Sequence, residues 1–198
     1  VAALGEKMFG AGREYNDMVM ITLGTGVGAG IIIDGKLFEG NRSAGAEIGH
    51  MLLVHGGEQC TCGRKGCFEA YSSATALIRD TRRAMQNHKD SLMWEIGSID
   101  NVTGKTPFDY AKKDKYAAEV VNNYIEMLGS ALTDIANIFR PEAIIIGGGV
   151  CAQGDNLIVP LKQKIQSELF GADFGSPEVV LRIAERGNKA GLVGAAAL

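Results

Sequence analysis

Three cysteines and one histidine lie close enough in the sequence to bind a metal ion together. Cys60, Cys62 and Cys67 fall within eight residues, and His50 lies ten residues before the first of them. One imidazole and three thiolates make a complete tetrahedral shell for zinc, and the glycines between the last two cysteines would let the backbone turn around the ion. A disulfide between two of these cysteines is the alternative, and it is less expected because no basic leader marks the chain as secreted. The remaining cysteine, Cys151, is isolated and is expected to be an ordinary buried residue.

Two glycine-rich segments could bring backbone close to a phosphate or a nucleotide. These segments are Gly24-Thr25-Gly26 and Gly147-Gly148-Gly149. Backbone N–H groups of a glycine turn can point at phosphate oxygens, and Thr25 adds a hydroxyl. The first segment has neither the Walker A nor the Rossmann pattern, so close packing of a strand on its neighbour would explain it equally well. For the second segment the alternative is a simple tight turn.

The composition is that of a globular domain. The chain has 198 residues, of which 46% are hydrophobic and 22% charged, and its formal net charge is -3. These values exclude a disordered chain and give no support to binding of a nucleic acid or a membrane surface. No apolar run reaches the roughly 18–20 residues that cross a bilayer. We therefore expect a cytoplasmic protein with no membrane partner.

The apolar pattern predicts an α/β fold with a mixed sheet, because antiparallel strands are followed by alternating helices and strands. Strands are expected at 18–23, 31–33, 36–39, 51–54, 143–146 and 179–183, and helices at 1–9, 73–86, 115–139, 156–169 and 190–198. Asp34-Gly35 predicts a two-residue hairpin turn. The helix at 115–139 has apolar residues at spacings of three and four, and Pro141 ends it. Residues 87–107 are polar and are expected to form an irregular surface excursion.

Around the cysteines the sequence resembles the ROK family, which comprises repressors, open reading frames and sugar kinases. The resemblance is carried by Glu47-Ile48-Gly49-His50 and by Cys60-Thr61-Cys62-Gly63-Arg64-Lys65-Gly66-Cys67-Phe68-Glu69. It extends over the whole chain, because the two glycine segments and the segment Ala190–Leu198 follow in the family's order. It implies an actin/hexokinase-like (ribonuclease H-like) ATPase fold in which ATP binds between two lobes.

The resemblance also implies roles for individual side chains. Glu47, His50 and Glu69 would bind the sugar, since a carboxylate can accept hydrogen bonds from two vicinal hydroxyls. One ring nitrogen of His50 would ligate the zinc ion and the other would contact a sugar hydroxyl. The first glycine segment would bind the phosphates of ATP and the second its base. The alternatives are a solvated loop position for Glu47 and a simple first-turn helix residue for Glu69.

The activity implied by the resemblance is transfer of the γ-phosphoryl group of Mg²⁺–ATP to a hexose after general-base removal of a hydroxyl proton. Glucose is the first expectation, and N-acetylmannosamine, fructose or allose are the alternative hexoses. A ROK-type transcriptional regulator that keeps the zinc loop and the sugar pocket is a second function, which a DNA-binding domain before Val1 would indicate. A homodimer is expected, as in many members of the family.

In the family, the general-base Asp belongs to an Asn-Asp pair just before the segment that matches Val1–Glu6. We therefore expect residues 1–198 to form the C-terminal, large lobe, without the N-terminal lobe and inactive alone. The helix at 189–198 is expected to pack on that absent lobe. Asn16-Asp17 is not the catalytic pair, because it precedes the strand at Met18.

Overall fold

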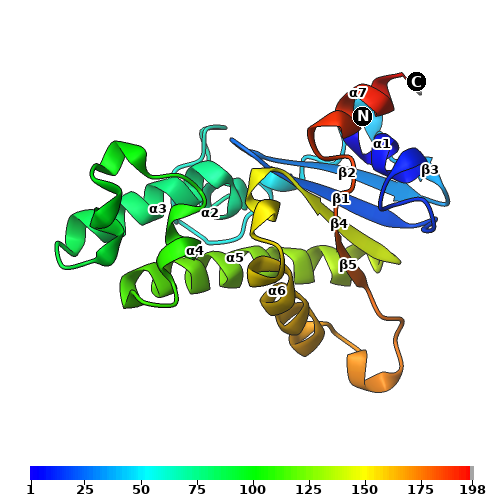
Figure 1. Ribbon diagram of the computed structural model, residues 1–198. Helices are drawn as coiled ribbons and strands as arrows, with labels where there is room; N and C mark the ends of the chain where they lie inside the picture. The colour runs from blue at the N-terminus through cyan, green and yellow to red at the C-terminus, as the bar shows by residue number, and fades with distance from the viewer. Residues whose placement is uncertain (197–198) are drawn as a thin grey trace.

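A five-stranded mixed sheet organises the fold (Figure 1), and the computed structural model describes residues 1–196. The strands are β1 (Met18–Leu23), β2 (Val27–Ile33), β3 (Lys36–Leu37), β4 (Ala143–Gly147) and β5 (Val180–Ile183). Their order is β3-β2-β1-β4-β5, with β1 antiparallel to β2 and parallel to β4, and β4 parallel to β5. The predicted mixed sheet is confirmed, as is the hairpin turn, where Asp34 and Gly35 both have positive φ angles.

Helices cover both faces of this sheet. They are α1 (Ala2–Phe9), α2 (Glu69–Ser72), α3 (Ala74–Asn87), α4 (Thr106–Tyr110), α5 (Lys115–Phe139), α6 (Asp155–Glu168) and α7 (Ala190–Ala195). Alternate residues of β1 enter two cores: Val19 and Ile21 join the core with α5 and α6, whereas Met18 and Met20 pack with α1 on the other face. A strand buried on both faces carries no polar alternation, which explains the apolar sequence of β1. Within residues 1–196, no helix combines the length and the apolar character needed to cross a membrane.

Four expectations about local structure are wrong. The strand expected at 31–33 begins earlier, at Val27, because residues 27–30 pair with β1. Segment 51–54 is not a strand, because only an isolated bridge joins Leu52 to Cys67. The strand expected at 36–39 ends at Leu37. Segment 87–107 is not merely a surface excursion: it contains buried Met93 and Val102, which form a separate small core with the ends of α3 and α5. The short helix α4 begins within this segment at Thr106 and was not expected.

A buried carboxylate joins the first and last parts of the described chain. Glu6 in α1 is fully buried, and its Oε2 accepts hydrogen bonds from the backbone N–H groups of Ala11 (2.8 Å) and Glu185 (3.1 Å). Its Oε1 accepts a third from Arg186 N (2.7 Å). Helix α7 follows this loop and packs on α1 (Figure 1). Residues 197–198 of the expected last helix lie outside the described residues.

Asp114 caps the long helix α5. Its side chain is buried, and one carboxylate oxygen accepts hydrogen bonds from the N–H groups of Tyr116 (2.8 Å) and Ala117 (3.2 Å), the other from Ser91 Oγ (2.6 Å). Burial alone would raise the pKa of Asp114, but these hydrogen bonds outweigh it and hold the pKa below its usual value. The ionised cap therefore stabilises the start of α5.

The substitution Asp114→Asn is expected to lower the free energy of unfolding by about 1–2 kcal/mol near neutral pH. The pKa of Asp114 is lower in the folded state. Its stabilising contribution is therefore complete above the unfolded pKa and is lost as the pH falls through the folded value. Urea denaturation should show the two proteins converging below about pH 4. The exposed control Asp134→Asn on the same helix should stay within about 0.5 kcal/mol, and a pH-independent difference for Asp114→Asn would contradict a charged cap.

Candidate functional site

The sequence-predicted residues meet at one cavity of about 590 Å³ at the carboxyl ends of β1 and β4. Strands β1 and β4 are parallel neighbours in the middle of the sheet. The other neighbour of β1 is β2, and the other neighbour of β4 is β5, on the opposite side. In open α/β sheets, ligands bind at the carboxyl ends of two strands whose connections lead to opposite sides in this way. Seven of the predicted residues line this cavity: Gly24, Gly26, Glu47, His50, Glu69, Gly147 and Gly148. Segments more than a hundred residues apart in the sequence therefore form one site.

Two residues of the predicted glycine segments do not line the cavity, and seven lining residues were not predicted: Ala2, Met20, Thr22, Val27, Gly28, Gly187 and Gly191. Thr25 is exposed, and neither it nor Gly149 is part of the wall. Thr22 lines the cavity instead, and its hydroxyl donates to the Gly28 carbonyl at 3.3 Å. Gly187 and Gly191, just before and within α7, complete the wall. The spacing of these two glycines, four residues apart, is the sequence feature that could have indicated that the last helix comes close to the cavity.

The two carboxylates of the cavity have different surroundings. Glu47 precedes a short 3-10 helix, Ile48–His50, and its exposed carboxylate has no hydrogen-bond or ion-pair partner among the described residues. Glu69 begins α2, and its carboxylate accepts hydrogen bonds from Val27 N (3.0 Å) and Thr61 Oγ1 (2.8 Å). Burial would raise the pKa of Glu69, but these hydrogen bonds outweigh it and leave the pKa below its usual value. The cavity thus offers one free carboxylate and one fixed carboxylate.

The histidine and the three cysteines come together as one cluster beside the cavity. Their ligand atoms lie within 4.8 Å of one another, with His50 Nδ1 3.7 Å from Cys60 Sγ, and Cys62 Sγ 3.7 Å from Cys67 Sγ. A tetrahedral zinc ion would place neighbouring ligand atoms about 3.5–3.8 Å apart, from bonds of about 2.3 Å to sulfur and about 2.0 Å to nitrogen. A disulfide would need about 2.05 Å, and all four cysteines of the chain are free. The donor set therefore fits a zinc ion.

The loop that carries the cysteines is held by its own backbone. Cys60 N donates to Arg64 O at 2.8 Å, and Arg64 Nη1 donates to His50 O at 3.1 Å. Gly66 has φ +84, and a Cβ there would lie 1.7 Å from Val54 O, so only glycine fits this close turn. Burial raises the pKa of the Cys67 thiol to about 12, so a cation's charge would be needed to hold it as a thiolate near neutral pH.

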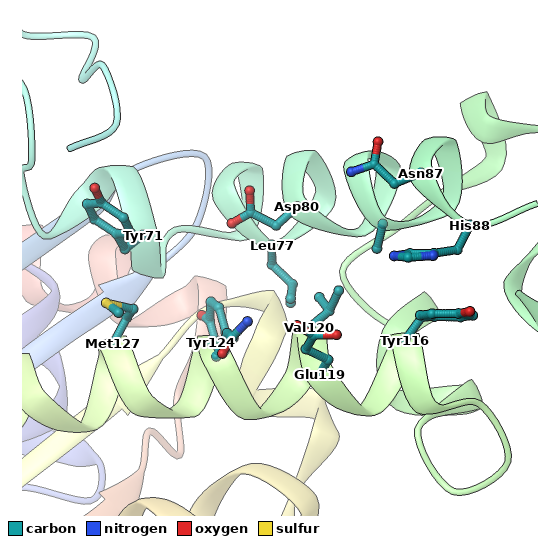
Figure 2. Close-up of a pocket in the computed structure, with 12 residues that line it drawn as sticks. Tyr71, Leu77, Asp80, Asn87, His88, Tyr116, Glu119, Val120, Tyr124 and Met127 are labelled. Atoms are coloured by element: carbon teal, nitrogen blue, oxygen red, sulfur yellow. The ribbon is translucent and has the colours of Figure 1, made fainter.

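A second cavity, of about 460 Å³, lies between α3 and α5 and contains none of the predicted site residues. Figure 2 shows Leu77 pointing toward α5 and Asn87 pointing away from it. At one end His88 and Tyr116 stack with ring centroids 3.8 Å apart. Its polar side chains do not converge on a common point, so the cavity at the strand ends is the stronger candidate site.

A mixed sheet with a cavity at its strand ends is the arrangement in which open α/β folds commonly bind ligands. A family model described as "ROK family" matches residues 1–198, so the chain belongs to the ROK family. The glucokinase of Thermotoga maritima is 38% identical over 197 residues, which are 98% of this chain and 62% of that protein. A xylose repressor of Caldicellulosiruptor bescii is 31% identical over 175 residues, 87% of this chain and 43% of that protein.

The solved structures agree with this membership. The crystal structure of a ROK family glucokinase from Streptomyces griseus in complex with glucose and AMPPNP is 37% identical and superposes with a TM-score of 0.90. The match covers 99% of this chain and 64% of that one. The expected actin/hexokinase-like ATPase fold is confirmed. The chain thus spans less than two thirds of the length of these glucokinases.

Proposed function

We propose that the chain is the C-terminal, large lobe of a hexose kinase that transfers the γ-phosphoryl group of Mg²⁺–ATP to glucose. The observation that carries this proposal is the single cavity in which Glu47, His50 and Glu69 face glycine-rich strand ends. The similarity to glucokinases at 38% identity supports the choice of substrates. Hexose kinases need both a sugar wall and a phosphate-binding turn, and residues suited to each line this one cavity.

In this proposal a zinc ion is structural. It would be held by His50, Cys60, Cys62 and Cys67, which supply all four ligands and leave no open position for water. Zinc would fix the orientation of the His50 ring through Nδ1, so that Nε2 is free to contact a sugar hydroxyl. The wall formed by Glu47 and His50 is then rigid before the sugar arrives.

The remaining residues position the two substrates. The unpartnered carboxylate of Glu47 would accept hydrogen bonds from two vicinal hydroxyls, and Glu69 would accept from a third. Backbone N–H groups of the turn at 24–26 would face the phosphates, and the segment at 147–149 would lie near the base. Mg²⁺ would neutralise charge on the transferring phosphoryl group. Positioning and charge neutralisation supply most of the acceleration in such a transfer.

We propose that the general base comes from the part of the whole protein that lies outside the region matched to the relatives. Asp17 does not fill this role: it precedes β1, at the opposite end of the strand from the cavity, and its Oδ1 accepts a hydrogen bond from Asp34 N at 2.7 Å. The 198-residue chain would then bind substrates without turning them over. We further propose that the whole protein is a cytoplasmic homodimer.

Calorimetry and a glucose 6-phosphate assay test this proposal on the 198-residue chain. We expect binding of glucose and of Mg²⁺–AMPPNP, with no product formed from glucose and ATP. Turnover at a normal rate would contradict a base outside these residues, and failure to bind glucose or another hexose would contradict the kinase. Binding of a sugar without any nucleotide would favour the second candidate, a transcriptional regulator, which the 31% identity to a xylose repressor supports.

A further inference from the structure

The carboxylate of Glu69 lies between the sugar wall and the glycine turn that ends β1. Its Oε2 accepts the hydrogen bond from Val27 N (3.0 Å), and its Oε1 accepts from Thr61 Oγ1 (2.8 Å) in the cysteine loop. Val27 lines the cavity beside the glycine turn, whereas Thr61 lies in the cysteine loop. A single side chain therefore spans from the metal-binding loop to the turn at 24–28.

The turn is held at its other side by the same short segment of chain. Ala74 N, at the start of α3, donates to Gly24 O at 2.9 Å, only five residues after Glu69. Inside the turn, Gly24 N donates to Gly26 O at 3.0 Å. Residues 69–74 thus contact the turn from both sides, and one of the two contacts depends on the orientation of the Glu69 side chain.

The absence of a side chain at Gly26 leaves the space that the Glu69 carboxylate occupies. A Cβ at Gly26 would lie 2.3 Å from Glu69 Oε2, so any other residue there must displace the carboxylate. The neighbouring Gly24 is different, because a Cβ there would meet nothing within 4 Å. Neither glycine has a positive φ, so alanine at either position is free of backbone strain. These two glycines therefore form a matched pair for testing the contact.

We propose that Glu69 is a positioning residue that couples the two ligands: sugar bound at its carboxylate fixes the turn and so tightens nucleotide binding. The proposal rests on the function proposed above, which assigns a hexose to one side of the cavity and a nucleotide to the other. A sugar hydroxyl bound to Glu69 would hold the carboxylate in the orientation that also accepts the Val27 N–H. Linkage requires the reverse effect as well, so the nucleotide tightens sugar binding by the same factor.

Calorimetry on the 198-residue chain, with glucose and Mg²⁺–AMPPNP separately and together, measures this coupling. In the wild type each ligand should tighten the other by about fivefold or more. Gly26→Ala should weaken glucose binding by about tenfold although Gly26 belongs to the nucleotide side, and should bring the coupling factor to about one. Gly24→Ala should weaken nucleotide binding alone and keep the coupling. Equal coupling in the wild type and in Gly26→Ala would overturn the proposal, whereas absence of any glucose binding by the wild type would overturn the proposed function itself.

Amide hydrogen exchange gives a readout of the contact that needs no ligand. The Val27 amide should exchange faster in Gly26→Ala and in Glu69→Ala, while Gly24→Ala keeps it protected. In the Glu69→Ala background, Gly26→Ala should have no further effect, because no carboxylate remains to be displaced. Unchanged protection of Val27 in both single variants would show that Glu69 does not fix the turn.

Discussion

Cys62→Ser will release the metal and weaken glucose binding by about tenfold or more, while the affinity for Mg²⁺–AMPPNP measured without sugar changes little. Cys62 is exposed, so its replacement leaves no cavity in the core, and a serine hydroxyl is a poor zinc ligand. Loss of the ion frees the ring of His50, which with Glu47 forms the proposed sugar wall, and also frees the loop that contains the cysteines. The turn at 24–26 joins the paired strands β1 and β2, and the segment at 147–149 begins at the last residue of β4, so the sheet still anchors both when the loop is released. Glu69 reaches Val27 from α2, outside that loop, so only its contact with Thr61 is lost.

Cys151→Ala provides the thiol control, because Cys151 is buried elsewhere and is not part of the cluster. It should retain the metal and bind glucose as the wild type does. Metal content by mass spectrometry and both affinities by calorimetry complete the comparison. Equal loss of glucose and nucleotide binding in Cys62→Ser would mean that the metal stabilises the fold of the whole lobe and not only the sugar wall. Full retention of metal would contradict the assignment of Cys62 as a ligand.

Glu47→Gln is expected to weaken glucose binding by roughly 10–100-fold with the zinc ion retained. The carboxylate can accept hydrogen bonds through both oxygens, whereas the amide keeps one acceptor and turns a donor toward the second hydroxyl. Hydrogen bonds to a charged group contribute about 1.5–3 kcal/mol each, which corresponds to this range. Because Glu47 has no partner among the described residues, its replacement should not disturb the loop.

The matched control is Glu119→Gln, an exposed glutamate that lines the second cavity between α3 and α5. It should leave glucose affinity unchanged, which separates a local effect from a change in net charge. Calorimetry with glucose and a metal assay on each variant decide the outcome. A metal-free Glu47→Gln protein would contradict the separation of the sugar contact from the metal, and unchanged affinity would remove Glu47 from the sugar site.

The long elements of the fold follow from local sequence. Helix α5 runs over the predicted residues Lys115–Phe139, because the apolar period covers these residues, Asp114 caps the start of the helix and Pro141 follows its end. Segment 51–54 has the apolar residues of a strand but not its hydrogen bonds. The N–H groups of Leu53 and Val54 both donate to Gly66 O, at 2.8 and 3.0 Å. The hydrogen bonds to the cysteine loop therefore outweigh the local preference of this segment for a strand. The local sequence pattern does not reveal these bonds.

The candidate site was predictable where its residues share a motif. The spacing of His50 and the three cysteines was enough to expect a metal cluster, the family resemblance added Glu47, and the structure places Glu47 and His50 at one cavity beside that cluster. The contact between Glu69 and Val27 joins residues 42 positions apart, and the approach of Gly187 comes from the far end of the chain. Such contacts depend on strand order and on helix packing, so they required the structure.

Zinc K-edge X-ray absorption on protein purified without added metal tests the central claim most directly, because it reads the identity and the ligands of the ion that would hold the sugar wall. The account predicts about one zinc per chain with three sulfurs at about 2.3 Å and one nitrogen at about 2.0–2.1 Å, and no change of this shell when glucose is added. Protein that contains no zinc, or a zinc shell of oxygen and nitrogen without sulfur, would contradict it.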